Sequence, residues 1–197
     1  MSVLIQMHGH PGSGKSAFAR ALGAALPAVV VDKDVVASAL IRAGIPWGEA
    51  GAPAYQVMYA QAARFLADGH AVVMDSPCFW PIIEETTRRI AAEADVPWLM
   101  IETLCPDDVR DARLAVRVRL ESNPVERDLG PMRPGMYLPE CERLVLDSTV
   151  TMDEMVVEAL AYVANRGPAL TPGKGFCSPD SCVAGEWSVR VEAAVVR

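Results

Sequence analysis

Apolar and polar positions alternate along this chain in a way that predicts parallel strands separated by helices. Short, almost continuous apolar runs are typical of strands buried on both faces. Such runs occupy residues 3–7, 28–31, 70–75, 98–104 and 143–147. Helix-forming or amphipathic stretches lie between and after them, at 17–26, 35–43, 54–68, 82–95, from 107 onward, and from Thr151 or Asp153 to about 165. This alternation predicts an α/β fold with a parallel sheet.

Residues 9–16, Gly-His-Pro-Gly-Ser-Gly-Lys-Ser, follow the first apolar run and fit the phosphate-binding pattern G-x-x-x-x-G-K-[ST]. Glycines let the backbone wrap closely around phosphate with its N–H groups pointing inward. Lys15 would carry positive charge toward the β- and γ-phosphates, and the Ser16 hydroxyl would ligate Mg²⁺. We therefore predict ATP and Mg²⁺ as ligands. The residues expected to bind the nucleotide are Gly9, His10, Pro11, Gly12, Ser13, Gly14, Lys15, Ser16, Ala17 and, farther along, Arg110.

Acidic residues end two of the apolar runs, at the sheet edge where open α/β folds bind their ligands. Asp32 and Asp34 follow the second run and, two residues apart, can project to the same side. One of them, preferably Asp34, is expected to take a proton from an attacking hydroxyl or to help hold the metal. Asp34 also has the position of a helix N-cap, and the alternative is that one Asp only caps while its partner is solvated.

Asp75 ends the third apolar run and is expected to hold Mg²⁺, directly or through water. Ser76 begins a segment, reaching to residue 81, that is a candidate wall of the acceptor pocket. Ser76 and Asp32 are therefore further candidates for contact with the substrate.

Arginines gather in the stretch after the fourth apolar run. Arg110, Arg113 and Arg117 are spaced three and four residues apart, which places them on one face of a helix. Guanidinium groups there would stabilise the charge on a transferring phosphate, and we predict this role for Arg113 and Arg117. The alternative is a solvated face paired with the nearby acids Asp107, Asp111 and Glu121.

Residues 122–142 are rich in Pro, Gly, Glu and Arg, and we expect a lid and acceptor-side surface there, with the lid spanning about 113–142. Within it, Arg127 and Arg133 are expected to reach an anionic substrate. From residue 167 the composition shifts to Pro, Gly, Ser and Cys. We predict one domain over residues 1–166 and a tail, 167–197, that could be pinned, an added strand or hairpin, a dimer contact or disordered.

Composition narrows the class of protein. The chain has 197 residues, a formal net charge of −7 and an isoelectric point of about 5.0, which argues against a broad nucleic-acid footprint. It contains no apolar run of membrane-spanning length, and the first strand follows Met1 too closely for a signal peptide. Five scattered cysteines beside a nucleotide-type loop indicate a reducing, cytoplasmic setting.

Four segments, in this order, resemble the kinase branch of the phosphate-loop proteins. They are residues 7–16 (MHGHPGSGKS), 31–34 (VDKD), 72–77 (VVMDSP) and 105–117 (CPDDVRDARLAVR). Over roughly residues 2–165 the chain is similar to a predicted ATP-binding kinase family that is grouped with polynucleotide kinases, zeta toxins, chloramphenicol phosphotransferase and gluconate kinase.

This resemblance implies a three-layer sandwich around a five-stranded parallel sheet of order 2-3-1-4-5. It also implies transfer of the γ-phosphate of ATP to an acceptor hydroxyl. Asp34 would then be the general base, Lys15 and the lid arginines would stabilise the transition state, and Ser16 would ligate Mg²⁺.

One position departs from this family. Several of these kinases carry an arginine for substrate phosphate three residues after the base, where this chain has Ala37. Together with the acidic charge, this favours a small hydroxylated acceptor over a phosphorylated or nucleic-acid acceptor. A polynucleotide 5′-hydroxyl kinase and a zeta-toxin-like nucleotide-sugar kinase are the alternatives within the class.

From another class, a nucleotide-binding NTPase switch acting on a protein partner is the alternative, although the chain lacks the Asn-Lys-x-Asp signature of GTPase switches. The oligomeric state, monomer or homodimer, stays open.

Overall fold

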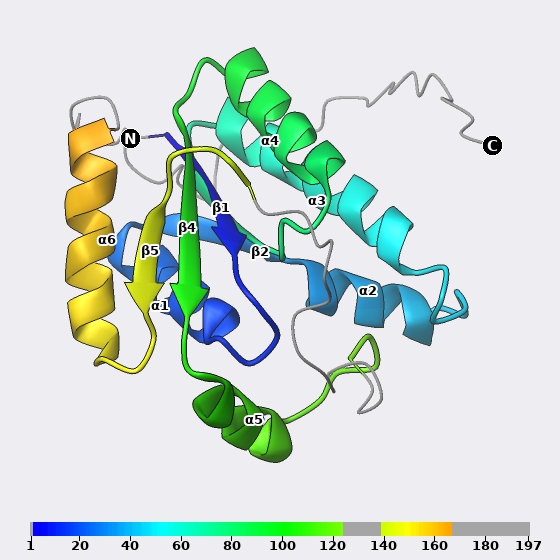
Figure 1. Cartoon of the computed structure of the whole chain (residues 1–197). Helices are drawn as coiled ribbons and strands as arrows, with labels where there is room; N and C mark the ends of the chain where they lie inside the picture. The colour runs from blue at the N-terminus through cyan, green and yellow to red at the C-terminus, as the bar shows by residue number, and fades with distance from the viewer. Residues whose placement is uncertain (1, 124–138, 167–197) are drawn as a thin grey trace, which may run out of the picture.

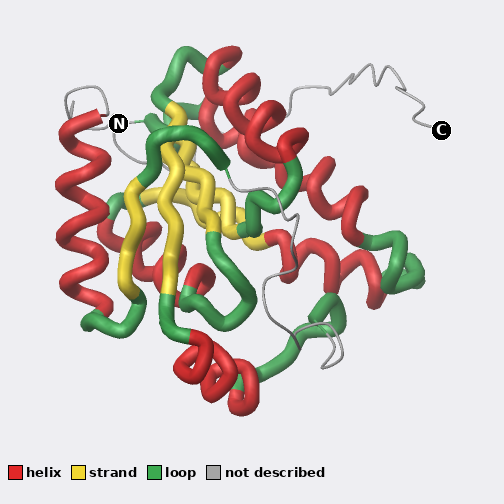
Figure 2. The backbone as a smooth tube through the Cα atoms, viewed as in Figure 1, coloured by secondary structure: helices red, strands yellow, loops and turns green. Residues whose placement is uncertain are grey.

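The computed structural model of the protein describes residues 2–123 and 139–166. It is a parallel sheet of five strands in the order β2-β3-β1-β4-β5, with helices on both faces (Figures 1 and 2). The strands are β1 Leu4–His8, β2 Ala28–Asp32, β3 Ala71–Asp75, β4 Trp98–Leu104 and β5 Leu144–Asp147. The helices are α1 Lys15–Ala25, α2 Lys33–Arg42, α3 Gly51–Ala67, α4 Pro81–Glu93, α5 Asp107–Val116 and α6 Met152–Arg166. The predicted fold class and strand order are confirmed.

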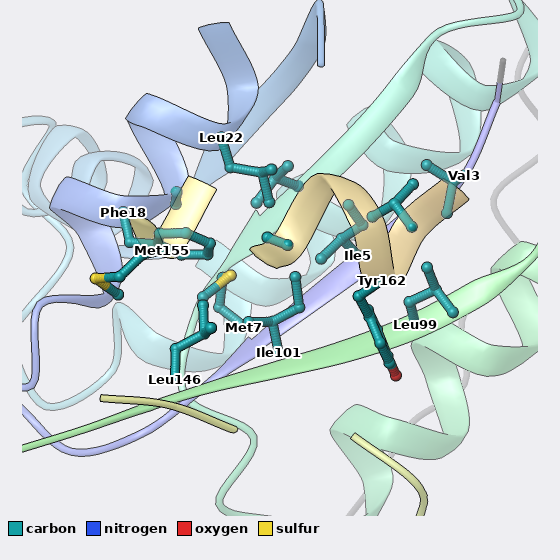
Figure 3. Packing of buried hydrophobic residues seen from close by; sticks show 14 of the residues in the cluster. Val3, Ile5, Met7, Phe18, Leu22, Leu99, Ile101, Leu146, Met155 and Tyr162 are labelled. Carbon is teal, nitrogen blue, oxygen red and sulfur yellow. The ribbon is translucent and has the colours of Figure 1, made fainter. Parts of the chain in front are cut away.

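The two faces of the sheet are covered by different helix pairs. Helices α1 and α6 pack against one face, and α3 and α4 pack against the other. Strand β1 runs through the middle, so its side chains alternate between two cores. Ile5 and Met7 join Phe18 and Met155 in the first core (Figure 3), whereas Leu4 joins Met58 in the second. Every residue of β1 and β3 is buried, which explains why these strands read as continuous apolar runs.

Element boundaries differ from the expectation mainly at helix starts. Helix α1 begins at Lys15, inside the phosphate-loop motif, and α3 begins at Gly51, three residues before the predicted helical stretch at 54–68. Helix α6 follows Thr151, whose hydroxyl accepts a hydrogen bond from the backbone N–H of Glu154 while the Glu154 carboxylate bonds back to the Thr151 N–H. This is a reciprocal capping box, and it decides between the two predicted starts in favour of Thr151.

Several predictions concern segments outside the described residues. These include Arg127 and Arg133, half of the predicted lid, and the tail at 167–197. Within residues 2–123 and 139–166, no helix combines the length and the apolar character needed to cross a bilayer.

Candidate active site

The phosphate loop joins β1 to α1 at the carboxyl edge of the sheet, and close packing explains two of its glycines. Gly9 has a φ of +127°, and a Cβ atom there would lie 2.5 Å from the carbonyl oxygen of Thr103. Gly12 has a φ of +81°, and its Cβ would lie 2.8 Å from Cγ of Arg110 and 2.9 Å from Cγ of Leu114. The loop therefore rests directly on β4 and α5, and a side chain at either glycine would push it away from them.

Polar contacts hold the loop in shape from two sides. The Lys15 ammonium is buried and donates to the carbonyl oxygen of His10 over 2.7 Å. On the side facing β4, the hydroxyls of Ser13 and Thr103 hydrogen-bond at 2.8 Å. Among the described residues no side chain caps the start of α1, and its first turn holds no acid. The first N–H groups of α1 are thus left for an anion, as a phosphate site requires.

Strands β2 and β3 bring two acids together beside this loop, because their register places Asp32 opposite Asp75. Burial, reinforced by the negative charge of Asp32, raises the pKa of Asp75 to about 6, against the opposing effects of a Ser16 hydrogen bond and the Lys15 charge. Within the described part of the chain, the Oδ2 atom of Asp75 is buried and has no hydrogen-bond partner. A carboxylate oxygen in this state is unfavourable unless a cation or donor joins it.

These groups fit the hard divalent cation expected with ATP. Asp75 offers a carboxylate oxygen and Ser16 a hydroxyl, which are the ligand types that Mg²⁺ prefers. No set of three or more His, Cys, Asp or Glu side chains in residues 2–123 and 139–166 could hold a metal by itself. Ser16 and Asp75 would therefore supply only part of the coordination, with phosphate oxygens and water completing it.

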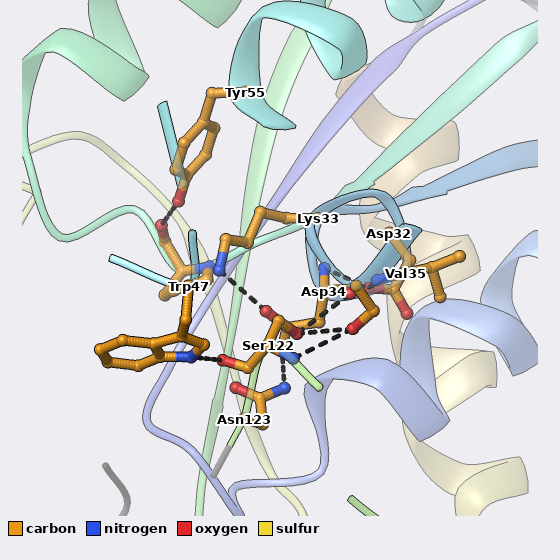
Figure 4. A network of polar contacts seen from close by, with 10 residues as sticks. Asp32, Lys33, Asp34, Val35, Trp47, Tyr55, Ser122 and Asn123 are labelled. Carbon is orange, nitrogen blue, oxygen red and sulfur yellow. Dashed lines mark hydrogen bonds and ion pairs between the residues drawn. The ribbon is translucent and has the colours of Figure 1, made fainter. Parts of the chain in front are cut away.

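Asp34 lies in the first turn of α2, with both carboxylate oxygens engaged (Figure 4). Lys33 Nζ lies 2.9 Å from its Oδ1, and the side-chain amide of Asn123 donates to its Oδ2 over 2.5 Å. The Asp34 side chain is 34% exposed, so an acceptor can still approach it. The expectation that Asp34 caps the helix is wrong. Asp32 is the N-cap, because its carboxylate accepts the backbone N–H groups of Asp34 and Val35.

Three residues of this network were not singled out from the sequence. Lys33 is only 5% exposed. Its position between two acids in the sequence was the available sign that it belongs to this network. Ser122 and Asn123 were assigned only to a long loop. Asn123 lies 89 residues from Asp34 in the chain, so no local pattern could have paired them.

The predicted arginines do not form a single face. Arg110 pairs with Asp107 and Asp111, two of the acids named in the alternative interpretation, but it is buried rather than solvated. Arg113 instead donates to both the side chain and the carbonyl oxygen of Ser148, the residue after β5. Helix α5 ends at Val116, and Arg117 follows with an extended backbone. The helical face is therefore limited to Arg110 and Arg113.

Arg113 nevertheless lies beside the phosphate loop. A Cβ atom on Gly14 would be 3.7 Å from its Nη1 atom and 3.4 Å from Cβ of Ser148. The loop also borders a cavity of about 310 Å³, whose walls include His10, Ser13 and Arg110. Three of the residues predicted to bind nucleotide thus surround one space.

In the segment predicted to wall the acceptor pocket, the ring of Phe79 lies beside the start of the phosphate loop, whereas Ser76 is turned into the fold. Ser76 is buried and accepts hydrogen bonds from the amide of Gln6. The Phe79 ring lies 5.5 Å from the imidazole rings of both His8 and His10, measured between centroids. Burial lowers the pKa of His8 to about 4, and burial followed by the Lys15 charge lowers the pKa of His10, so both rings are neutral near pH 7.

A chain of buried polar contacts continues from His8 across the sheet. Its Nε2 atom lies 3.7 Å from Oε1 of Glu102, the residue opposite it on β4. Arg143 donates to the other Glu102 oxygen over 2.6 Å and to the carbonyl oxygen of Pro139. These residues, which the sequence analysis did not single out, tie the segment before β5 to the strand that leads into the phosphate loop.

A family model described as an AAA domain matches residues 4–137, more than half of the chain. Among curated proteins, uncharacterized proteins of Mycobacterium bovis and Mycobacterium tuberculosis are 28% identical over 121 residues. Each alignment covers 55% of this chain and 24% of the other protein. The chain therefore spans about a quarter of the length of the curated relatives it matches.

Solved structures share the fold. A candidate kinase from Chloroflexus aurantiacus aligns with a TM-score of 0.67 and 22% identity, over 84% of this chain and 97% of that one. The APS kinase of M. tuberculosis in complex with AMPPNP and APS aligns at 0.59 and 17%, over 82% and 97%. A gluconokinase from Sinorhizobium meliloti aligns at 0.56 and 20%, over 83% and 91%. At these identities the likeness establishes a common phosphate-loop kinase fold.

Proposed function

The chain belongs to the AAA domain family, and from this premise we propose that it is an ATP-dependent phosphotransferase. It would move the γ-phosphate of ATP to a hydroxyl of a small-molecule acceptor. The observation that carries the proposal is that two carboxylates with different surroundings lie at the same edge of the sheet as the phosphate loop. Asp75 is buried, and among the described residues one of its oxygens has no hydrogen-bond partner, whereas Asp34 is partly exposed and held by donors. Hydrolysis of a nucleotide needs only a carboxylate such as Asp75, which can help to hold the metal. A partly exposed carboxylate such as Asp34 is suited to an acceptor hydroxyl.

Each group has a role in the proposed step. The acceptor oxygen forms a bond to the γ-phosphorus while the bond from that phosphorus to the β–γ bridging oxygen breaks, and ADP leaves. The acceptor proton passes to a carboxylate oxygen of Asp34. Lys15, Arg113 and Arg117 would offset the charge on the transferring oxygens. Bound Mg²⁺, held in part by Ser16 and Asp75, would neutralise phosphate charge.

A small acceptor without a phosphate group agrees best with the described surroundings of Asp34. Ala37, which replaces the arginine found in several related kinases, is buried in α2 and offers no charge. The fold relatives include an APS kinase and a gluconokinase, which act on small molecules by their names, and this supports a small-molecule acceptor.

The test is ADP release from ATP-Mg across a panel of acceptors, compared with an acceptor-free blank. The panel holds ribonucleosides, aminoglycosides, phenicols, sugars, nucleotide sugars and 5′-hydroxyl oligonucleotides. We expect stimulation by one small-molecule class. Lys15→Ala should lower the stimulated rate by about a hundredfold to a thousandfold, the scale for losing one group that stabilises transition-state charge. Arg64→Ala, which removes an exposed pair with Asp68, is the matched control.

Two outcomes would contradict the proposal. Full activity of Lys15→Ala would remove the phosphate loop from the reaction. A slow release of ADP that no acceptor stimulates would favour an NTPase switch with a protein partner instead.

A further inference from the structure

Residues 121–123, which follow the arginine-bearing stretch, are anchored on α2. The Ser122 hydroxyl accepts from the Ser38 hydroxyl over 3.0 Å and donates to the Asp34 carbonyl oxygen over 3.0 Å. The Ser122 backbone N–H donates back to the Ser38 hydroxyl, and Trp47 Nε1 donates to the Ser122 carbonyl oxygen. Ser38 and Ser122 are both almost fully buried. Such a closed set of buried hydrogen bonds fixes one arrangement, because each broken member leaves a buried polar group unpaired.

These hydrogen bonds around Ser122 place the Asn123 side chain against Asp34. Asn123 is 7% exposed, and its amide donates to Asp34 Oδ2 over 2.5 Å. Lys33 contacts the other oxygen, so donors from two sides set the plane of the carboxylate (Figure 4). A carboxylate oxygen has two lone pairs, and one remains for an acceptor proton when a donor occupies the other. The amide is neutral and orients the carboxylate without adding a second positive charge beside it.

The stretch of chain that leads from α5 to Asn123 starts in contact with the phosphate loop. Leu114 of α5 lies so close to Gly12 that a Cβ on this glycine would be 2.9 Å from its Cγ atom. From there the chain passes Arg117 and reaches Ser122 on α2. One end of the stretch therefore contacts the loop that would hold the phosphates, and the other contacts the carboxylate that would hold the acceptor.

We propose that Asn123 is a positioning residue for the phosphotransferase reaction, orienting Asp34 toward the acceptor hydroxyl, with the Ser38–Ser122 hydroxyl pair holding Asn123 in place. The proposal rests on the proposed function. It adds that the orientation of the base is set from outside its own helix, by the chain that follows α5. Precise orientation matters because small misplacements of a base reduce transfer steeply.

The first test needs no acceptor. The side-chain amide resonances of Asn123, assigned by their loss in Asn123→Ala, should lie downfield in the proton dimension because the amide donates to a charged oxygen. In Asp34→Asn they should move upfield, toward the positions of the other asparagine in the chain. Resonances that do not respond to Asp34→Asn would overturn the contact.

The second test measures transfer to whichever acceptor of the panel stimulates ADP release most. Asn123→Ala and the nearly isosteric Asn123→Leu, which both lack the donor, should lower kcat by about tenfold, the scale of one hydrogen bond to a charged group. The KM for ATP should stay within about twofold of the wild-type value, because no change reaches the phosphate loop. Asn123→Ser, which keeps a donor, should restore part of the loss. Arg89→Ala, which removes an exposed pair with Glu93 on α4, is the control and should match the wild type.

The outcomes separate the two proposals. Wild-type kcat in Asn123→Leu, while Asp34→Asn is impaired, would overturn the positioning role and leave the phosphotransferase intact. Losses that follow lowered melting temperatures equally in all variants would assign Asn123 a structural role only. If the wild type transfers to no acceptor while the amide resonances respond to Asp34→Asn, the proposed function fails, and the positioning role fails with it although the contact exists.

Discussion

The phosphate loop and the Asp34 network lie at the same edge of the sheet but are built in opposite ways. The loop is one continuous stretch, residues 9–16, shaped by glycines and by packing on β4 and α5. The network is assembled from α2, Trp47 and residues 122–123 through side-chain hydrogen bonds. The difference shows that one continuous stretch of sequence can encode a site for a shared ligand. A site for a particular acceptor depends on contacts between distant segments.

If this contrast is correct, each region should fail in its own way when a single residue is changed. Changes in the network should reduce turnover while nucleotide binding survives. Changes in the loop should weaken nucleotide binding and the packing of α5 together.

The largest effect is expected in the network, at Asp34. Asp34→Asn keeps the size of the side chain but removes the proton acceptor, so kcat should fall by about a hundredfold to ten-thousandfold. Calorimetry should find ATP-Mg affinity nearly unchanged, because Asp34 contacts Lys33 and Asn123, which lie outside the phosphate loop. A comparable loss of ATP-Mg affinity would instead make Asp34 a metal holder and blur the contrast between the two regions.

A smaller effect is expected in the loop, at Gly12. Gly12→Ala combines a left-handed backbone with a clash against Arg110 and Leu114, and should destabilise the protein by about 2–4 kcal/mol. ATP affinity should fall with it. Gly69→Ala is the matched control, because Gly69 has a φ of +86° and no atom within 4 Å of its Cβ position. Equal losses of unfolding free energy in the two variants would show that backbone strain alone explains the effect.

The smallest effect is expected at Asp75, where it should have the opposite sign for stability. The native carboxyl keeps its proton up to a pKa of about 6, above its ordinary value of 3.8, so its contribution to stability falls as pH rises through that interval. Without Mg²⁺, Asp75→Asn should therefore gain about 1–3 kcal/mol over the wild type above pH 6 and little below pH 4.

Denaturant titrations at several pH values measure this gain, with Asp95→Asn as an exposed control whose left-handed backbone suits asparagine. Asp75→Asn should also lose the dependence of ATP binding on Mg²⁺. A variant that is no more stable than the wild type above pH 6 would contradict the cost of the buried charge.

The same contrast explains what could be predicted from the sequence. Strands β1 and β3 are buried on both faces, so their apolar runs located them to within a residue. The loop motif directly follows β1, and Asp75 is the last residue of β3, so both were found together with these strands. The cap of α2 was misassigned because Asp32 and Asp34 both suit an N-cap, and only the backbone decides where the helix begins.

Other features had no local signal. The pairing of Glu102 with Arg143 and of Asp34 with Asn123 depends on which segments the fold brings together. Arg110, Arg113 and Arg117 carry the right charge and spacing, yet the helix ends before Arg117 and carboxylates engage Arg110. Periodicity assigns a face, but neighbouring side chains decide what each charge contacts.

The hydroxyl pair of Ser38 and Ser122 joins segments 84 residues apart and so bears on how this protein could evolve a new acceptor. Replacing α2 and α3 with those of a homologue, while keeping residues 121–123, would leave a buried hydroxyl without its hydrogen-bond partner. The expected cost in stability is about 1–3 kcal/mol. The two segments should therefore be inherited as a pair. Positions 38 and 122 should covary among homologues, and chimeras should recover the donor's acceptor preference only when both segments are exchanged.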